Sequence, residues 1–171
     1  MRPLAWLTAI LVLVGRPVAA QEKLLTDWGT FVFERDLGST SGLVAGPADS
    51  VYRVLKAFFA DVKLAMKEDD PANHQLGVKR LRVSRRIGTK PVSAFLSCGE
   101  GITGANADLW HVFLNLGAQV SPAPKGSRLQ ILLSADAVDV PGGRSERVPC
   151  ATTGRLELNI LTHLRQVFPG T

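Results

Sequence analysis

Cys98 and Cys150 are the two cysteines of the chain, and their thiols could serve three kinds of chemistry. A metal pair usually includes a Cys-x-x-Cys or a nearby histidine, and neither cysteine has one. A catalytic thiol is the second hypothesis. The third is a disulfide, which forms in oxidising compartments. We predict the disulfide, because the chain also begins with an export signal, described below.

The segment Gly99–Gly104 matches the Gly-x-Gly-x-x-Gly spacing that holds a dinucleotide pyrophosphate at the start of a helix. That chemistry also needs an acidic residue about 20 residues further on. The acid is missing here, and an alternating strand pattern follows the glycines. We therefore interpret the segment as a connection between strands and predict no cofactor.

The histidines and carboxylates form no recognisable catalytic motif. The three histidines lie far apart in the sequence: His74, His111 and His163. His111 is close to Asp108, but on a strand these side chains would point to opposite faces. Glu100, Asp108 and Glu157 could meet near the cysteines, which would allow hydrolysis or cyclisation. Because the chain lacks the zinc-protease, nucleophile-elbow and Walker patterns, a cyclase-like or hydrolase-like enzyme is a minority hypothesis, with no catalytic residue or metal ligand named.

The chain is basic, with 20 Lys and Arg against 15 Asp and Glu. No acid lies between Pro71 and Gly99, whereas six basic residues do: Lys79, Arg80, Arg82, Arg85, Arg86 and Lys90. They could contact anionic lipid headgroups, a polyanionic envelope polymer or an acidic partner. The alternative is a solvated strand face whose charges prevent edge-to-edge pairing. Nucleic acid is not expected, because no aromatic side chain lies between the arginines for base stacking.

Residues 1–20 are typical of a secretory signal: a positive Met1-Arg2, an apolar Leu4–Val14 and small residues at Val18-Ala19-Ala20. The apolar run is shorter than the roughly 17 to 25 residues that span a bilayer. An uncleaved anchor or a buried N-terminal helix is the alternative. We expect a bacterial protein exported to the periplasm or secreted, with residues 21–171 as one domain and no transmembrane segment in the mature chain.

Two amphipathic helices are predicted. The first begins at Pro47 and would end at Glu68–Pro71, and its apolar residues recur at intervals of four and three: Val51, Leu55, Phe58 and Val62. The second follows Cys150, with Thr152 or Thr153 as N-cap. Its apolar residues recur at intervals of four: Leu156, Ile160, Leu164 and Phe168.

Alternation of apolar and polar residues predicts the strands. They cover residues 28–35, 76–87, 92–98, 110–116 and 129–133, with loops at 36–46, 88–91 and 121–127. Within 76–87, the arginines would share a solvated face and the apolar residues Leu81, Val83 and Ile87 the buried one. This order predicts an α+β fold, in which an N-terminal-half helix and the C-terminal helix pack on one face of an antiparallel sheet.

The order resembles the helix-grip group, which includes START and Bet v 1-like (SRPBCC) domains and the helix-grip modules of an outer-membrane assembly lipoprotein. Gly46–Tyr52 is similar to the segment where such domains enter their first long helix. Four further segments resemble a pattern of exported bacterial proteins with a cysteine pair: Cys98-Gly99, Thr103-Gly104, Ala107-Asp108 and Cys150–Glu157. The resemblance implies a groove between the C-terminal helix and the sheet that could hold an apolar ligand.

Binding rather than catalysis is therefore the expected function. One hypothesis is a carrier of a small apolar ligand, with a pocket lined by Trp110, Val112, Leu129, Ile131, Ile160 and Leu164. The same residues would equally form an ordinary core. The other is an envelope interaction or assembly module, which would use its basic strand face or an exposed sheet edge to bind an envelope protein or an anionic surface.

Overall fold

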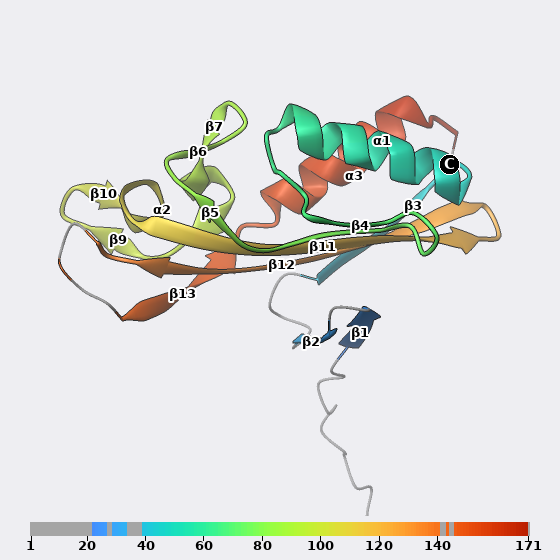
Figure 1. The fold of residues 1–171 in the computed structure, drawn as a ribbon. Coiled ribbons are helices and arrows are strands. Elements are labelled where there is room, and N and C mark those ends of the chain that lie inside the picture. Colours follow the sequence, from blue (N-terminus) through green and yellow to red (C-terminus); the bar gives the residue numbers. More distant parts are fainter. Residues whose placement is uncertain (1–21, 27–28, 34–38, 141–142, 144–145, 171) are drawn as a thin grey trace, which may run out of the picture.

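The computed structural model describes residues 22–170, except 27–28, 34–38, 141–142 and 144–145 (Figure 1). The predicted signal at 1–20 and Trp28 lie outside the described residues. Within the described ranges, no helix has both the length and the apolar character needed to cross a membrane.

A seven-stranded antiparallel sheet dominates the fold. Its strands are β3 (Ser39–Val44), β4 (Glu68–Asp70), β5 (Gln75–Val83), β8 (Leu96–Ser97), β11 (His111–Ala123), β12 (Gly126–Val138) and β13 (Arg147–Thr152). The order is β4-β5-β11-β12-β13-β8, and β3 also pairs with β12. β3 and β13 therefore share one edge of β12, at 127–132 and 135–138 respectively.

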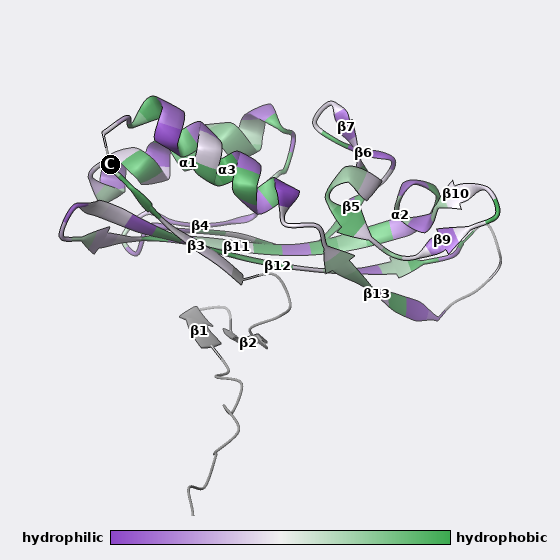
Figure 2. Ribbon diagram, turned by 180° about the vertical axis from the view of Figure 1, so that it is seen from behind, coloured by the Kyte–Doolittle hydropathy of each residue, from purple (hydrophilic) through white to green (hydrophobic). Residues whose placement is uncertain are grey.

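Helices α1 (Ala48–Asp61) and α3 (Arg155–Val167) lie on the same face of this sheet (Figures 1 and 2). Their fully buried side chains, which include Leu55 and Phe59 from α1 and Ile160 and Leu164 from α3, join one core with the inward residues of β11 and β12. The predicted α+β class, with two helices on one face of an antiparallel sheet, is confirmed. We call the opposite face of the sheet its outer face.

Smaller elements complete the fold. They are the hairpins β1 (Glu22–Thr26) with β2 (Gly29–Phe33), β6 (Arg86–Ile87) with β7 (Lys90–Pro91), and β9 (Glu100–Gly101) with β10 (Gly104–Ala105), the 3-10 turn η1 (Val92–Ala94) and helix α2 (Asn106–Leu109). The β6–β7 hairpin projects on the same side of the sheet as α1 and α3 (Figures 1 and 2).

The first helix is shorter than predicted, and two strands flank it. Helix α1 ends at Asp61, because Lys63 adopts a left-handed φ of 58° and Leu64 turns back into the core. Glu68–Asp70 then forms β4 rather than the end of the helix. The loop predicted for 36–46 contains β3, which pairs with β12 although it includes Gly42, a residue type that is depleted in strands.

The strand predicted for 76–87 is divided. Lys79 and Arg80 form a bulge opposite Asn115, and Arg80 has a φ of 51°. The strand stops at Val83, and Arg85, with a φ of 62°, redirects the chain into the β6–β7 hairpin. The basic segment therefore does not form one continuous face.

The remaining differences lie near the cysteines and the long hairpin. Residues 92–98 hold η1 and β8 instead of one strand, and Cys150 lies in β13, not at a helix start. Helix α3 has Gly154 as its N-cap, with a φ of 74°, in place of Thr152 or Thr153. Strands β11 and β12 extend through the predicted 121–127 loop and leave only residues 124 and 125 to make the turn.

Candidate functional site

Cys98 and Cys150 form a disulfide with an S–S distance of 2.05 Å, which confirms the predicted pairing. Ser97 and Ala151 are paired across β8 and β13, so the bond joins the next pair of that ladder. Both cysteines are buried, and no free thiol occurs in the described ranges. The disulfide therefore ties the short β8 to the main sheet.

The glycine-rich segment forms a connection, as predicted: β9, a tight turn and β10. It wraps around the buried Asn106, whose amide nitrogen donates to the Cys98 carbonyl at 3.3 Å and whose backbone N–H donates to Gly99 at 3.0 Å. A Cβ added at Gly101 would lie 3.1 Å from the Asn106 oxygen. Helix α2 follows with only four residues, and the glycines serve local packing.

The candidate acids do not form one cluster. Glu100 and Asp108 line the same cavity, but both Asp108 oxygens accept from Ser93, at 2.8 Å from its N–H and 2.6 Å from its hydroxyl. Glu157 is fully buried at the start of α3, where it accepts from Thr152 at 2.8 Å. In the part of the chain that the structure describes, no three His, Cys, Asp or Glu residues come together as a metal site.

The histidines are also separated. His74 pairs with Asp49 at 2.7 Å, and the His163 ring packs against Phe58 with centroids 5.0 Å apart. His111 does not contact Asp108; its Nε2 lies 2.7 Å from Arg82 Nη2. Each histidine thus has a different local partner.

A polar cluster links α1 to β4. The Tyr52 hydroxyl donates to Asp69, and the Lys56 ammonium pairs with the same carboxylate. The hydrogen bond from Lys56, followed by that from Tyr52, lowers the pKa of Asp69. Burial and the bond to Asp69 raise the pKa of Tyr52 well above its usual value. These contacts therefore favour an ionised Asp69 and a protonated Tyr52, and they hold α1 against β4. We call Tyr52, Lys56 and Asp69 the tether.

The six candidate pocket residues separate into two places. Val112, Leu129, Ile131, Ile160 and Leu164 have no exposed surface and belong to the core. Trp110 is partly buried and lines a cavity of about 740 Å³ at the disulfide end of the sheet. The space between α3 and the sheet is thus occupied by core side chains.

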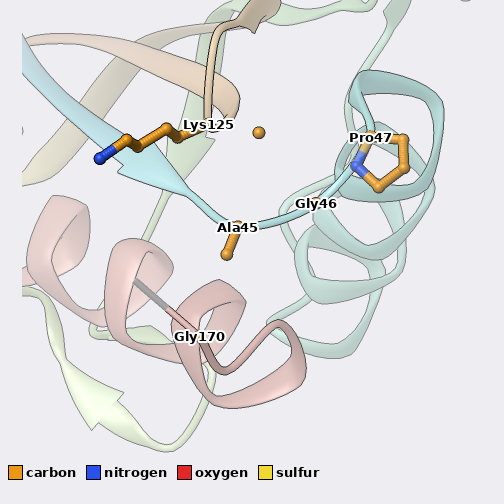
Figure 3. A pocket seen from close by; sticks show the side chains of 6 residues that line it. Ala45, Gly46, Pro47, Lys125 and Gly170 are labelled. Carbon is orange, nitrogen blue, oxygen red and sulfur yellow. The ribbon is translucent and has the colours of Figure 1, made fainter.

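Two other cavities are lined by few side chains that could take part in catalysis or bind a polar ligand. One, of about 680 Å³, lies where β3 meets α1 and is lined mainly by small residues and Pro47 (Figure 3). Its Lys125 side chain extends away from Pro47 and the start of α1 (Figure 3). The second, of about 230 Å³, has apolar walls from Phe59, Leu64 and Leu76, and also includes Lys56 and Asp69 of the tether.

The six basic candidates also separate. Arg80 and Arg82 are exposed and lie on the outer face of β5, beside Phe113. Arg85, Arg86 and Lys90 instead belong to or adjoin the β6–β7 hairpin, which lies on the helix side of the sheet (Figures 1 and 2). Lys79 is half-buried in the bulge. The structure therefore brings together only two of the predicted arginines on the outer face.

Two residues absent from the sequence-based site complete a cluster around these arginines. Phe113 in β11 lies directly opposite Arg82 in β5. Arg147 lies in β13, on the other side of β12. The Cζ atoms of Arg80 and Arg147 lie 4.9 and 5.8 Å from the Phe113 ring centroid, within the range of cation–π contacts. We call Arg80, Arg82, Phe113 and Arg147 the outer-face patch.

Neighbouring polar groups hold the patch in place. The Arg80 N–H donates to Asn115 Oδ1 at 2.9 Å, and the Asn115 amide donates to Ser134 at 3.2 Å. Because a guanidinium only donates, His111 Nε2 must accept from Arg82. Arg147 lies 3.4 Å from an Asp136 oxygen.

The sequence carried a signal for one of the two missed residues. Phe113 lies between the inward Val112 and Leu114, so alternation places it on the outer face. Arg147 lies in β13, a strand that no pattern predicted, and only the pairing of β13 with β12 brings it to the patch.

The chain matches no protein-family model, and comparison with curated proteins and with solved structures likewise finds no match.

Proposed function

We propose that this protein is an exported, non-catalytic binding module that contacts the phosphate groups of anionic lipids through its outer-face patch. The observation that carries the proposal is the placement of the Arg80 and Arg147 guanidinium groups over the Phe113 ring, with Arg82 directly opposite Phe113 in the sheet, on the face away from the helices. The helices cover only the other face (Figure 1).

The chemistry of the patch suits phosphate. All three cations are arginine, whose planar fork of donors binds phosphate through paired hydrogen bonds. Arg80 and Arg82 contact uncharged groups, the Phe113 ring and a His111 nitrogen that accepts a hydrogen bond. Within the described ranges Asp136 pairs with Arg147 alone, so the positive charge of the patch exceeds its negative charge.

A lipid surface suits the shape of the patch. Its residues come from β5, β11 and β13, and β12 lies between the last two strands, so they present a broad face instead of a deep pocket. Each arginine near an anionic bilayer contributes about 1 kcal/mol of attraction. Three such groups would give weak, salt-sensitive binding.

An apolar ligand between α3 and the sheet has less support. Five of the six candidate pocket side chains are fully buried in the core, and a ligand there would have to displace them. The outer-face patch needs no rearrangement of the core. For this reason we favour the second sequence-based hypothesis.

Vesicle co-sedimentation tests the proposal. The oxidised protein should bind phosphatidylglycerol-containing vesicles at low salt and not pure phosphatidylcholine vesicles. The triple variant R80S/R82S/R147S should lose most of this binding. The matched control, R85S/R86S/K90S, removes the same charge from the β6–β7 region and should retain it.

Two results would contradict the proposal. One is equal loss of binding in both triple variants, which would indicate attraction by net charge alone. The other is an absence of binding by the unmodified protein while an acidic protein partner binds the same patch. Circular dichroism of both variants establishes that each is folded, since all the substituted side chains are exposed.

A further inference from the structure

His111 lies beside the outer-face patch. It points to the same side of β11 as Phe113, because Val112 between them is fully buried in the core. Its Nε2 atom lies 2.7 Å from Nη2 of Arg82. The imidazole is half-buried and Arg82 is exposed, so both are reached from the outer face.

This contact is possible in only one protonation state of His111. A guanidinium group has no acceptor, and an imidazolium has N–H donors at both nitrogens. Nε2 can therefore accept from Arg82 only when the ring is neutral and its proton is on Nδ1. Protonation of the ring would set two donors and two positive charges against each other at 2.7 Å, and Arg82 would have to move away.

The neighbouring strands add few charges on this face. In β12, the residue opposite His111 is the uncharged Val138, which is also paired with Arg147 of β13. The Asp136 carboxylate is 3.4 Å from Arg147. An imidazolium at His111 would thus be a further positive charge beside Arg82 and Arg147.

The remaining charges near His111 belong to the cavity at the disulfide end, which its neighbour Trp110 lines. They are Arg85, Glu100, Asp108 and Asp139. Both Asp108 oxygens accept from Ser93. Among the described residues, His111 does not line this cavity, so these groups act on it from a distance, whereas Arg82 contacts it directly.

We propose that His111 makes the lipid contact of the outer-face patch dependent on pH, with tighter binding in mild acid. This inference rests on the proposed function. Histidine side chains change charge between about pH 5 and 8. Protonation would add a fourth positive charge to the patch and release Arg82, whose guanidinium could then donate two hydrogen bonds to one lipid phosphate. The phosphodiester of phosphatidylglycerol stays ionised over this range, so the lipid contributes no change of its own.

Co-sedimentation of the oxidised protein with phosphatidylglycerol-containing vesicles tests this, at about pH 8 and about pH 5. The affinity should rise at least about fivefold at the lower pH, the gain expected from one added cation at an anionic surface. H111Q supplies a neutral acceptor for Arg82 at both pH values and should lose this gain. The matched control, H163Q, removes a histidine from α3 on the opposite face and should keep it.

Two further measurements examine the protonation state directly. H111K carries a permanent charge and should bind at about pH 8 nearly as tightly as the unmodified protein does at about pH 5. Without lipid, nitrogen NMR at about pH 8 should find the His111 proton on Nδ1. Circular dichroism of each variant establishes that it is folded.

The outcomes separate this inference from the proposed function. Equal binding of the unmodified protein at both pH values would overturn the pH dependence and leave the lipid contact standing. So would a gain in acid that H111Q retains, because another group would then be responsible. No binding at either pH would overturn the lipid contact, and this inference with it.

Discussion

The Thr152 hydroxyl links the start of α3 to the buried Glu157: it accepts from the Gly154 N–H at 3.0 Å and donates to Glu157 Oε1 at 2.8 Å. Glu157 occupies the third helical position, from which a capping-box glutamate would reach the N-cap N–H directly. Here the Thr152 hydroxyl lies between the two groups and connects the Gly154 N–H to Glu157. Among the described residues Glu157 Oε2 has no hydrogen-bond partner, so the Thr152 hydroxyl holds the one satisfied oxygen of a fully buried carboxyl group.

Replacing Thr152 with Val should lower the free energy of unfolding by about 1–3 kcal/mol, since it leaves buried polar groups without their partner. Thr152→Ser keeps the hydroxyl and is the matched control. Urea denaturation of both variants measures the difference. A Thr152→Val variant as stable as the Ser variant would show that the Thr152 hydroxyl contributes nothing.

Removing the disulfide should destabilise the fold. Its cysteines are 52 residues apart, and the chain-entropy relation gives about 4 kcal/mol as an upper value for a loop of this size. The Cys98→Ala/Cys150→Ala double variant should therefore unfold at lower denaturant concentration than the oxidised chain. Adding a reductant should bring the unmodified chain close to the variant; an unchanged midpoint on reduction would count against this role.

Gly126 and Gly104 offer a matched pair, because both have a φ of 120° but different surroundings. A Cβ at Gly126 would lie 2.3 Å from the Val44 carbonyl oxygen, whereas a Cβ at Gly104 meets nothing within 4 Å. Gly104→Ala should cost only the backbone strain, about 1–3 kcal/mol. Gly126→Ala should cost more in thermal or urea unfolding, and equal losses would disprove the close approach of β3 to this turn.

The lowered pKa of Asp69 predicts that the free energy of unfolding decreases at acid pH. Its pKa is lowered from the ordinary 3.8, first by Lys56 and then by Tyr52. A lowered carboxyl pKa stabilises the fold above about pH 4, and this contribution is lost as the pH falls through the folded-state pKa. Asp69→Asn should therefore reduce the loss of stability on acidification.

An NMR titration separates the two partners of Asp69. Lys56→Met should raise the pKa of Asp69 toward 3.8 more than Tyr52→Phe does, because the hydrogen bond from Lys56 is the larger cause. The opposite ranking would mean that the buried Tyr52 hydroxyl controls this carboxyl group.

Some features that the sequence analysis missed were nevertheless encoded locally. The apolar side chains of β5 that pack in or against the core are even-numbered at Leu76 and Val78 and odd-numbered at Leu81 and Val83. A bulge at Lys79 and Arg80 produces this change of parity, since it adds one residue to the strand. The change is visible in the sequence and locates the bulge, beyond which Arg80 and Arg82 share the outer face.

The sequence by itself determined the two amphipathic helices, the long β11–β12 alternation and the cysteines available for pairing, because these depend on local periodicity and composition. Only the tertiary structure decided that Ser39–Val44 and Arg147–Thr152 are strands, because both become strands by pairing with β12. The same pairing brings Arg147 to Phe113, and the turn at Arg85 removes Arg86 from the outer face. The candidate site depends on these long-range contacts, which neighbouring residues in the sequence do not specify.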